Sequence, residues 1–98
     1  MNARIVLPNK QQIQITQNGQ LFGRNELMNA GLQQQVIKYV SRQHFRVYFD
    51  NTGFYIEDAG SSGGTKLNNA DIKDKGRQPL KNDDQIVLSN TLWLTFQI

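Results

Sequence analysis

The chain has 98 residues and a mass of 11.2 kDa, which is the size of one small globular domain. It contains no cysteine and one histidine, and this excludes a disulfide framework, a thiolate metal site and a cysteine nucleophile. We therefore expect a single domain over residues 1–98 that holds no metal ion and no cofactor.

The net charge of +3 is divided unevenly along the chain. Residues 1–49 carry six basic and one acidic side chain, whereas residues 50–98 carry five basic and seven acidic ones. A basic half is compatible with binding to nucleic acid, to an anionic surface or to a phosphorylated partner. The charge alone does not choose between these partners.

No segment has the length and apolar composition of a membrane helix, which needs about 20 residues. Apolar stretches are as short as residues 5–7 and 92–94. The sequence also shows no basic and then apolar leader with a small-residue cleavage site. These features predict a cytoplasmic protein that does not bind to a membrane.

Alternating apolar and polar residues predict strands along much of the chain. Ile13 and Ile15 alternate with glutamines, and in residues 44–49 the apolar face consists of Phe45, Val47 and Phe49. In residues 92–98 the even-numbered residues are apolar and form one face, while the odd-numbered ones form the other. The chain is therefore predicted to end as a strand.

Turn-forming residues separate these runs about every ten residues. They lie at positions 8–9, 18–19, 51–53, 60–64, 68–69, 75–76 and 82–83. Many short strands at this spacing favour an all-β fold, a two-sheet antiparallel β-sandwich that buries the apolar faces between its sheets. The one stretch with helical character is residues 25–35, interrupted by Gly31, for which we predict a single helical turn within a long loop.

Three short polar clusters are candidates for a functional site. They are Gly23-Arg24 at the end of a predicted strand, residues 41–44 (Ser-Arg-Gln-His) before one, and residues 58–65 between two. Loops at one edge of a sandwich can converge on a shared surface. Arginine forks, hydroxyl groups and glycine amides suit a phosphate monoester, which needs charge-assisted and backbone hydrogen bonds but no base or metal.

The order and spacing of the clusters resemble the forkhead-associated (FHA) domain. The family pattern is Gly-Arg, Ser-Arg-x-His, Asp-x-Gly-Ser-Thr-Asn-Gly-Thr-x-Val-Asn-Gly and Leu-x-x-Gly-Asp-x-Ile. The matching segments are Gly23-Arg24 and residues 40–44, 56–69 and 80–86, so the resemblance covers about residues 3–98. It implies a two-sheet β-sandwich whose loops at one edge bind phosphothreonine peptides.

The resemblance assigns phosphopeptide contacts to specific residues. Arg24 matches the arginine that grips the phosphate, and Ser41 matches the serine whose hydroxyl donates to it. Arg42 matches a position that often adds a second phosphate contact, and Ser62 matches a hydroxyl of the glycine loop that faces the phosphate. Gly63 stands where the family usually has an asparagine that holds the peptide main chain, and the backbone amides around Gly63 are predicted to orient the phosphate.

The resemblance assigns a supporting role to His44, Thr65 and Asn68, which match positions that hold the binding loops in place. Asn69 and Asp83 replace family glycines in turns, but asparagine and aspartate tolerate a positive φ better than other residues. Tyr39 matches a position that helps to select the third residue after the phosphothreonine. Because position 63 lacks this asparagine, the contact to the peptide main chain is missing unless Asn25, Asn68 or Asn69 replaces it.

The resemblance implies a non-catalytic module that binds phosphothreonine on partner proteins in Ser/Thr-kinase signalling, either alone or as one domain of a longer parent protein. Two alternatives stay open: an FHA scaffold that binds proteins without phosphate, which the loss of the asparagine favours, and an OB-like nucleic-acid binder. The second alternative depends on Arg46, Tyr48 and Tyr55, but a solvated sheet face has the same pattern. We therefore disfavour nucleic acid as the partner.

A catalytic interpretation is the weakest. Residues 60–64 fit the G-x-S-x-G pattern of hydrolases, and His44 and Asp58 would complete a triad. That pattern requires a strand-to-helix turn on a large α/β sheet, whereas residues 65–67 continue toward another strand. We predict no catalytic residue.

Overall fold

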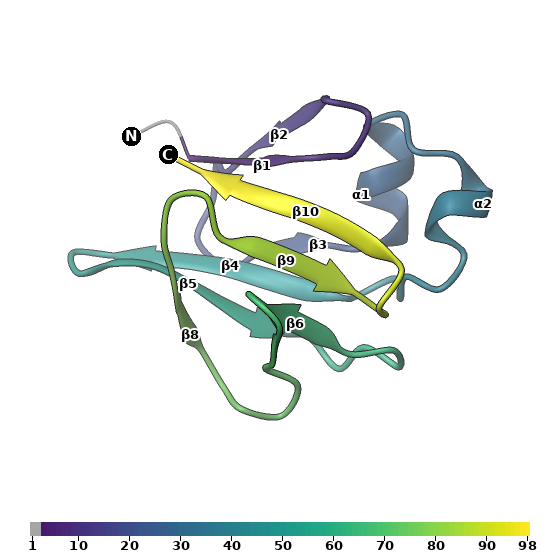
Figure 1. Ribbon diagram of the computed structural model, residues 1–98. Coiled ribbons are helices and arrows are strands. Elements are labelled where there is room, and N and C mark those ends of the chain that lie inside the picture. Colours follow the sequence, from purple (N-terminus) through teal and green to yellow (C-terminus); the bar gives the residue numbers. More distant parts are fainter. Residues whose placement is uncertain (1–2) are drawn as a thin grey trace.

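Two antiparallel sheets packed face to face form the domain, in a computed structural model that describes residues 3–98 (Figure 1). The six-stranded sheet has the order β2 (Gln12–Gln14), β1 (Arg4–Val6), β10 (Leu92–Gln97), β9 (Gln85–Leu88), β6 (Thr65–Leu67), β7 (Ala70–Asp71). The four-stranded sheet has the order β3 (Gln20–Phe22), β4 (Phe45–Asp50), β5 (Gly53–Asp58), β8 (Gln78–Leu80). The predicted all-β sandwich is confirmed.

The alternation that predicted the strands also defines the interior. In β10 the residues Leu92, Leu94 and Phe96 are buried while Trp93 is exposed, as predicted. Ile98 follows the end of this strand and is exposed, so the buried face ends at Phe96. Each fully buried aliphatic or aromatic side chain stabilises the fold by about 1.5–3 kcal/mol.

Aromatic rings join the strands and the two sheets. Phe22 of β3 stacks on Phe45 of β4 with ring centroids 4.9 Å apart and planes 9° apart. Phe54 of β5 meets Phe96 of β10, in the other sheet, at 5.2 Å. Phe49, predicted on the buried face of β4, is 37% exposed, because the hairpin of β4 and β5 extends beyond the neighbouring strands (Figure 1).

The connection from β3 to β4 contains more helix than the single turn predicted from the sequence. It forms α1 (Arg24–Asn29) and α2 (Gln34–Ile37). Leu27 and Ile37 of these helices are fully buried, and Leu32 between them is buried as well. Burial of these apolar residues stabilises two short helices whose intrinsic propensity is modest, which explains why the sequence pattern underestimated them.

Most predicted turns are present. Asn69 and Asp83 have φ values of 73° and 69°, so both residues adopt the left-handed turn conformation that was expected of them. One turn was missed: Ser89 and Asn90 connect β9 to β10 with φ values of 53° and 55°.

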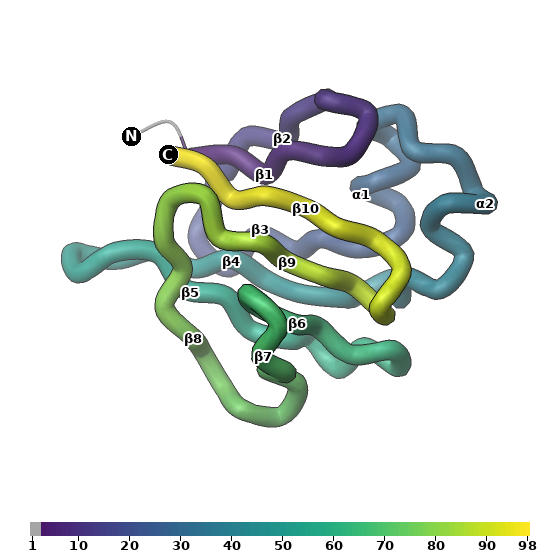
Figure 2. The backbone as a smooth tube through the Cα atoms, in the orientation of Figure 1, coloured from purple at the N-terminus to yellow at the C-terminus, as the bar shows by residue number. Residues whose placement is uncertain are grey.

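One end of the sandwich carries three connections, those from β3 to β4, from β5 to β6 and from β9 to β10 (Figure 1). The two ends of the described chain, at Ala3 and Ile98, lie at the opposite end (Figure 2). They are neighbours because β1 pairs with β10, with Arg4 opposite Gln97. Within residues 3–98, no helix is long and apolar enough to cross a membrane.

Candidate functional site

An open hollow of about 420 Å³ lies where the three connections meet. It is lined by Arg24, Lys38, Tyr39, Val40, Ser41, Ser62, Gly63, Ser89 and Thr91. Four residues assigned to phosphopeptide binding from the sequence, Arg24, Ser41, Ser62 and Gly63, are therefore brought together. Both charged residues in this lining are basic, which suits an anionic ligand.

The first residue of α1, Arg24, is held at the edge of the hollow by the backbone. Its Nε donates to the carbonyl oxygen of Val40 at 3.1 Å, and its amide donates to the carbonyl oxygen of Ser41 at 3.1 Å. The preceding Gly23 leaves no room for a side chain, because a Cβ there would overlap the Arg42 carbonyl. The Gly-Arg pair thus brings two chain segments close together and fixes one side of the guanidinium.

Two hydroxyl groups in the lining of the hollow lie next to each other. Ser41 Oγ accepts a hydrogen bond from the Ser62 amide at 3.1 Å, and the two Oγ atoms are 3.2 Å apart. The serines come from different connections, 21 positions apart in the sequence. This contact places two donors side by side in the lining of a basic hollow.

His44 is fully buried and links the two loops that carry these serines. Its Nδ1 accepts from the Ser41 amide at 3.0 Å, and its Nε2 donates to the Gly64 carbonyl at 2.9 Å. Burial lowers the pKa of His44, although the Gly64 carbonyl and the Asp58 carboxylate act in the opposite direction. The ring is neutral at pH 7 and both its nitrogens bond to backbone, so it activates no serine.

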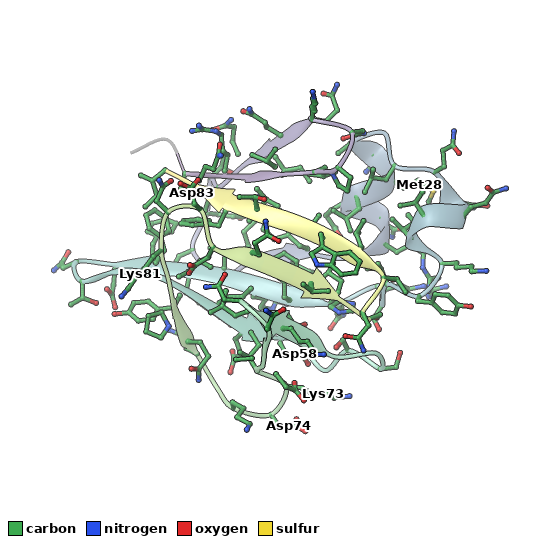
Figure 3. The ribbon with its side chains drawn as sticks, in the orientation of Figure 1. Met28, Asp58, Lys73, Asp74, Lys81 and Asp83 are labelled. Atoms are coloured by element: carbon green, nitrogen blue, oxygen red, sulfur yellow. The ribbon has the colours of Figure 1, made fainter. Side chains whose placement is uncertain are left out.

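Asp58, labelled in Figure 3, organises the connection from β5 to β6, and sequence reasoning gave it no structural role. Its carboxylate accepts from the amides of Gly60 and Ser61 at 3.0 Å and from the hydroxyls of Ser61 and Thr65 at 2.6 Å. Burial raises the pKa of Asp58, but these hydrogen bonds outweigh burial and the net pKa is lowered. The Asp-x-Gly-Ser segment was the signal that could have revealed this role.

Thr65 is linked to the site through Asp58. Its side chain is buried, and its hydroxyl donates to the carboxylate that holds the glycine loop. It lies at the start of β6, directly after the loop that contains Ser62 and Gly63. Its position agrees with a supporting role.

The missed turn between β9 and β10 forms another wall of the hollow. Ser89 Oγ donates to the Tyr39 carbonyl at 2.7 Å and so connects this turn to the segment before β4. A Cβ on Gly63 would overlap Ser89 Oγ. Glycine fits at position 63 because Ser89, in the turn between β9 and β10, already occupies the space that a side chain would need.

Two residues assigned to the site lie outside the hollow. Arg42 is exposed and is absent from the lining, although it follows Ser41 in the chain. Asn68 lies beyond the other end of β6, where it donates to the Asp84 carboxylate at 2.8 Å and accepts from the Gln85 amide at 2.9 Å. It supports the turn before β9 rather than the loops around the hollow, which contradicts the predicted support of the binding loops.

Comparison with known proteins identifies similar sequences and folds. A family model described as the FHA domain matches residues 10–89. A probable E3 ubiquitin-protein ligase, dma1, of Schizosaccharomyces pombe is 36% identical over 55 residues, which are 52% of this chain and 21% of that protein. The chain thus matches only about a fifth of that relative.

Solved structures with the same fold include two FHA domains. One, from a study of phosphothreonine-dependent FHA domain interactions, has a TM-score of 0.78 at 21% identity and covers 100% of this chain and 97% of that one. The N-terminal FHA domain of Rad53p from S. cerevisiae, in complex with a phosphothreonine peptide, has a TM-score of 0.76 at 21% identity, with 100% and 94% covered. At this identity the likeness shows the fold.

Proposed function

Because the chain belongs to the FHA domain family, whose members are generally non-catalytic interaction modules, we propose that it binds phosphothreonine on partner proteins. The observation that carries this proposal is the convergence of Arg24, Ser41 and Ser62 on one open, basic hollow. A phosphothreonine dianion seated there would replace water with charge-assisted hydrogen bonds.

Each lining group has a defined role in this proposal. The Nη groups of Arg24 donate to no group within residues 3–98, so they are available to form a fork on two phosphate oxygens. The hydroxyls of Ser41 and Ser62 donate to the oxygens that remain, and the Gly63 amide, which also has no partner in the described chain, borders the same space. Arg42 adds positive charge beside Ser41. His44 and Asp58 fix the loops before the ligand arrives, which reduces the entropy that binding costs.

The ligand also defines the cellular setting that we propose. Phosphothreonine is made by a Ser/Thr kinase, so in this proposal the domain acts downstream of one, in the cytoplasm. In this role it brings proteins together, alone or within a longer chain, and performs no chemistry of its own.

The test is a titration of the wild-type domain and of Arg24→Ala against matched peptide pools that carry phosphothreonine, phosphoserine or unmodified threonine, followed by fluorescence anisotropy. We expect selective phosphothreonine binding that Arg24→Ala weakens by about 30-fold or more, since a buried charge contact contributes about 2–4 kcal/mol. Arg77→Ala is the matched control, because Arg77 stacks on Tyr48 at 3.6 Å and lines none of the hollow.

Other outcomes would point to other functions. Binding to none of the peptides would favour an FHA scaffold that recognises proteins without phosphate. A single-stranded oligonucleotide included in the same assay reports on nucleic-acid binding, which weakens steeply with salt. Oligonucleotide binding without phosphopeptide binding would contradict the proposal.

A further inference from the structure

Among the described residues, no helix covers the outer face of the six-stranded sheet, which is turned toward the viewer in Figure 1. Every second residue of its strands points to this face, because the residues between them, such as Ile5, Ile86 and Leu94, are buried against the other sheet. We define the amide face as six outward residues in two rows across the strands: Gln12, Val6, Thr95 and Gln85 in one row, and Trp93 and Val87 in the other.

The amide face carries no formal charge. Charged side chains lie only at its margins, where Arg4 is opposite Gln97, and where Lys66 lies between Val87 and Asp71 in the pairing register. The cores of protein interfaces are depleted of charged residues, whereas surfaces that stay in water normally carry many. The composition of this face is therefore that of an interface core.

Trp93 is the large apolar side chain of the amide face. It is 53% exposed, although Val87, its partner on the next strand, is only 5% exposed. Within residues 3–98 the indole N–H of Trp93 has no hydrogen-bond acceptor. Tryptophan is among the residues most enriched at the energetic centres of interfaces, because its ring buries a large apolar area and its N–H still finds a partner.

The groups of the amide face suit a second copy of the same chain. The side-chain amides of Gln12 and Gln85 have no partner within the described residues, and an amide carries both donors and an acceptor. Two copies of such groups can therefore satisfy each other across a two-fold axis. Each copy has a net charge of +3, so two copies repel each other least where no charged side chains face one another.

We propose that the amide face is a self-association surface, at which two copies of the domain pack sheet against sheet around Trp93. Strands are about 4.8 Å apart, so the four strands β2, β1, β10 and β9 span about 20 Å. A patch of this width is smaller than a standard interface, which buries about 1,200–2,000 Å² in total. We therefore expect a weak dimer, with a Kd of about 100 µM. This inference does not depend on phosphothreonine binding.

The experiment is sedimentation of the wild-type domain over concentrations from about 10 µM to about 1 mM. The mass should rise from the monomer value of 11.2 kDa toward twice that value. Trp93 is the only tryptophan of the chain, so its fluorescence reports on this face alone. Its emission should shift to shorter wavelength over the same concentrations, because association removes the ring from water.

Thr95→Arg places a like charge in the amide face and keeps the fluorophore. It should raise the Kd of self-association about tenfold or more, and Gln85→Arg, at the neighbouring position, should do the same. Val36→Arg is the matched control, since it adds the same charge at an exposed position of α2, outside this face, and should associate as the wild type does. Urea denaturation verifies that all the variants are folded.

Each other outcome overturns the inference. A mass of 11.2 kDa at every concentration would exclude self-association. A rise in mass without a shift in Trp93 emission, or an equal loss in Val36→Arg and Thr95→Arg, would exclude this face as its site. Phosphopeptide titrations keep the two proposals apart, because Thr95 does not line the hollow and Thr95→Arg should bind the peptide within about twofold of the wild type.

Discussion

Gly63 and Ser89 fill one space between them: a Cβ on Gly63 would overlap the Oγ of Ser89 and press on its Cβ and Cα. The same Oγ donates to the Tyr39 carbonyl, so the turn between β9 and β10 is held against two loops of the site at once. The family asparagine at position 63 does not fit beside this turn. Glycine at this position is a packing requirement of the domain.

This relationship predicts a compensating pair of substitutions. Gly63→Ala should destabilise the domain by about 1–3 kcal/mol, since overpacking forces neighbouring atoms to move. Ser89→Gly removes the overlapping atoms and suits the φ of 53° at this position, so the double variant should recover most of the loss. Urea denaturation of the four proteins measures this coupling, and strictly additive losses would show that the two residues do not share space.

Asp58→Asn should destabilise the domain by about 2–3 kcal/mol. The amide group would keep one acceptor but would direct N–H groups at the donors of Gly60, Ser61 or Thr65, and hydrogen bonds to a charged group contribute about 1.5–3 kcal/mol. Because the pKa of Asp58 is lowered in the folded state, the wild-type advantage should be complete above about pH 4 and should decline as the pH falls through the folded pKa. Chemical denaturation of both proteins between pH 7 and pH 3 checks this, and a constant difference would contradict it.

His44 should make the stability of the free domain depend on pH. Burial lowers its pKa below the ordinary value of 6.5, so the unfolded chain takes up a proton more readily than the folded one. The contribution of His44 is therefore complete above about pH 6.5 and is lost as the pH falls below that value toward the folded pKa. Unfolding by urea at pH 7.5, 6.5 and 5.5 should show this loss in the wild type.

The control for this prediction is His44→Asn, whose side-chain oxygen can still accept from the Ser41 amide. This variant should be less stable at pH 7.5, because it loses the bond to Gly64, but its stability should change less between pH 7.5 and pH 5.5. An equal pH dependence in both proteins would mean that another group titrates.

Ser41 and Ser62 should contribute to phosphopeptide binding as a coupled pair. Their Oγ atoms are 3.2 Å apart, and the Ser62 amide donates to Ser41 Oγ, so Ser41→Ala removes a ligand donor and also frees the loop that carries Ser62. The two single alanine variants should each weaken binding about tenfold, and the double variant should lose less than the product of both effects. Contacting residues typically couple by about 0.5–3 kcal/mol in such a cycle, which anisotropy titrations resolve. Independent effects of the two substitutions would contradict this coupling.

The affinity of the domain for a phosphothreonine peptide should weaken as the pH falls from 7 to 5. A phosphothreonine has a second pKa of about 6, so most of the dianion becomes a monoanion in this range and much of the attraction to Arg24 is lost. A titration series at constant ionic strength measures the trend. An affinity that stays constant across this range would argue against capture of a dianion.

The fold was largely predictable because its strands follow simple alternation. Leu92, Leu94 and Phe96 mark a buried face without ambiguity, and asparagine or glycine marks most of the turns. The helices were underestimated because burial of Leu27 and Ile37, which no local pattern reveals, decides their extent. Phe49 follows the alternation that predicts a buried residue, but it is partly exposed because the hairpin of β4 and β5 extends beyond the other strands.

The convergence of residues on the candidate site was predictable where short motifs carry the geometry. Arg24, Ser41 and Ser62 line one hollow, as expected from motifs whose order along the chain is distinctive. Ser89 was missed because its contact with Tyr39 spans 50 positions and has no local signature. Asn68 was assigned to loop support from the resemblance alone, whereas it follows the far end of β6 and bonds to the turn before β9.

The neighbouring termini determine how the domain would respond to tension. A force applied between the two ends of the chain would peel β1 from β10. It would load the hydrogen bonds between these strands one pair after another, beginning with Arg4 and Gln97. A force between a bound peptide and either terminus runs instead along the length of the strands, from one end of the sandwich to the other, and loads many of these bonds together. Pulling on both ends would therefore open the domain from the end remote from the hollow. Pulling on a bound peptide would be resisted more strongly, because many hydrogen bonds between strands bear the load at once.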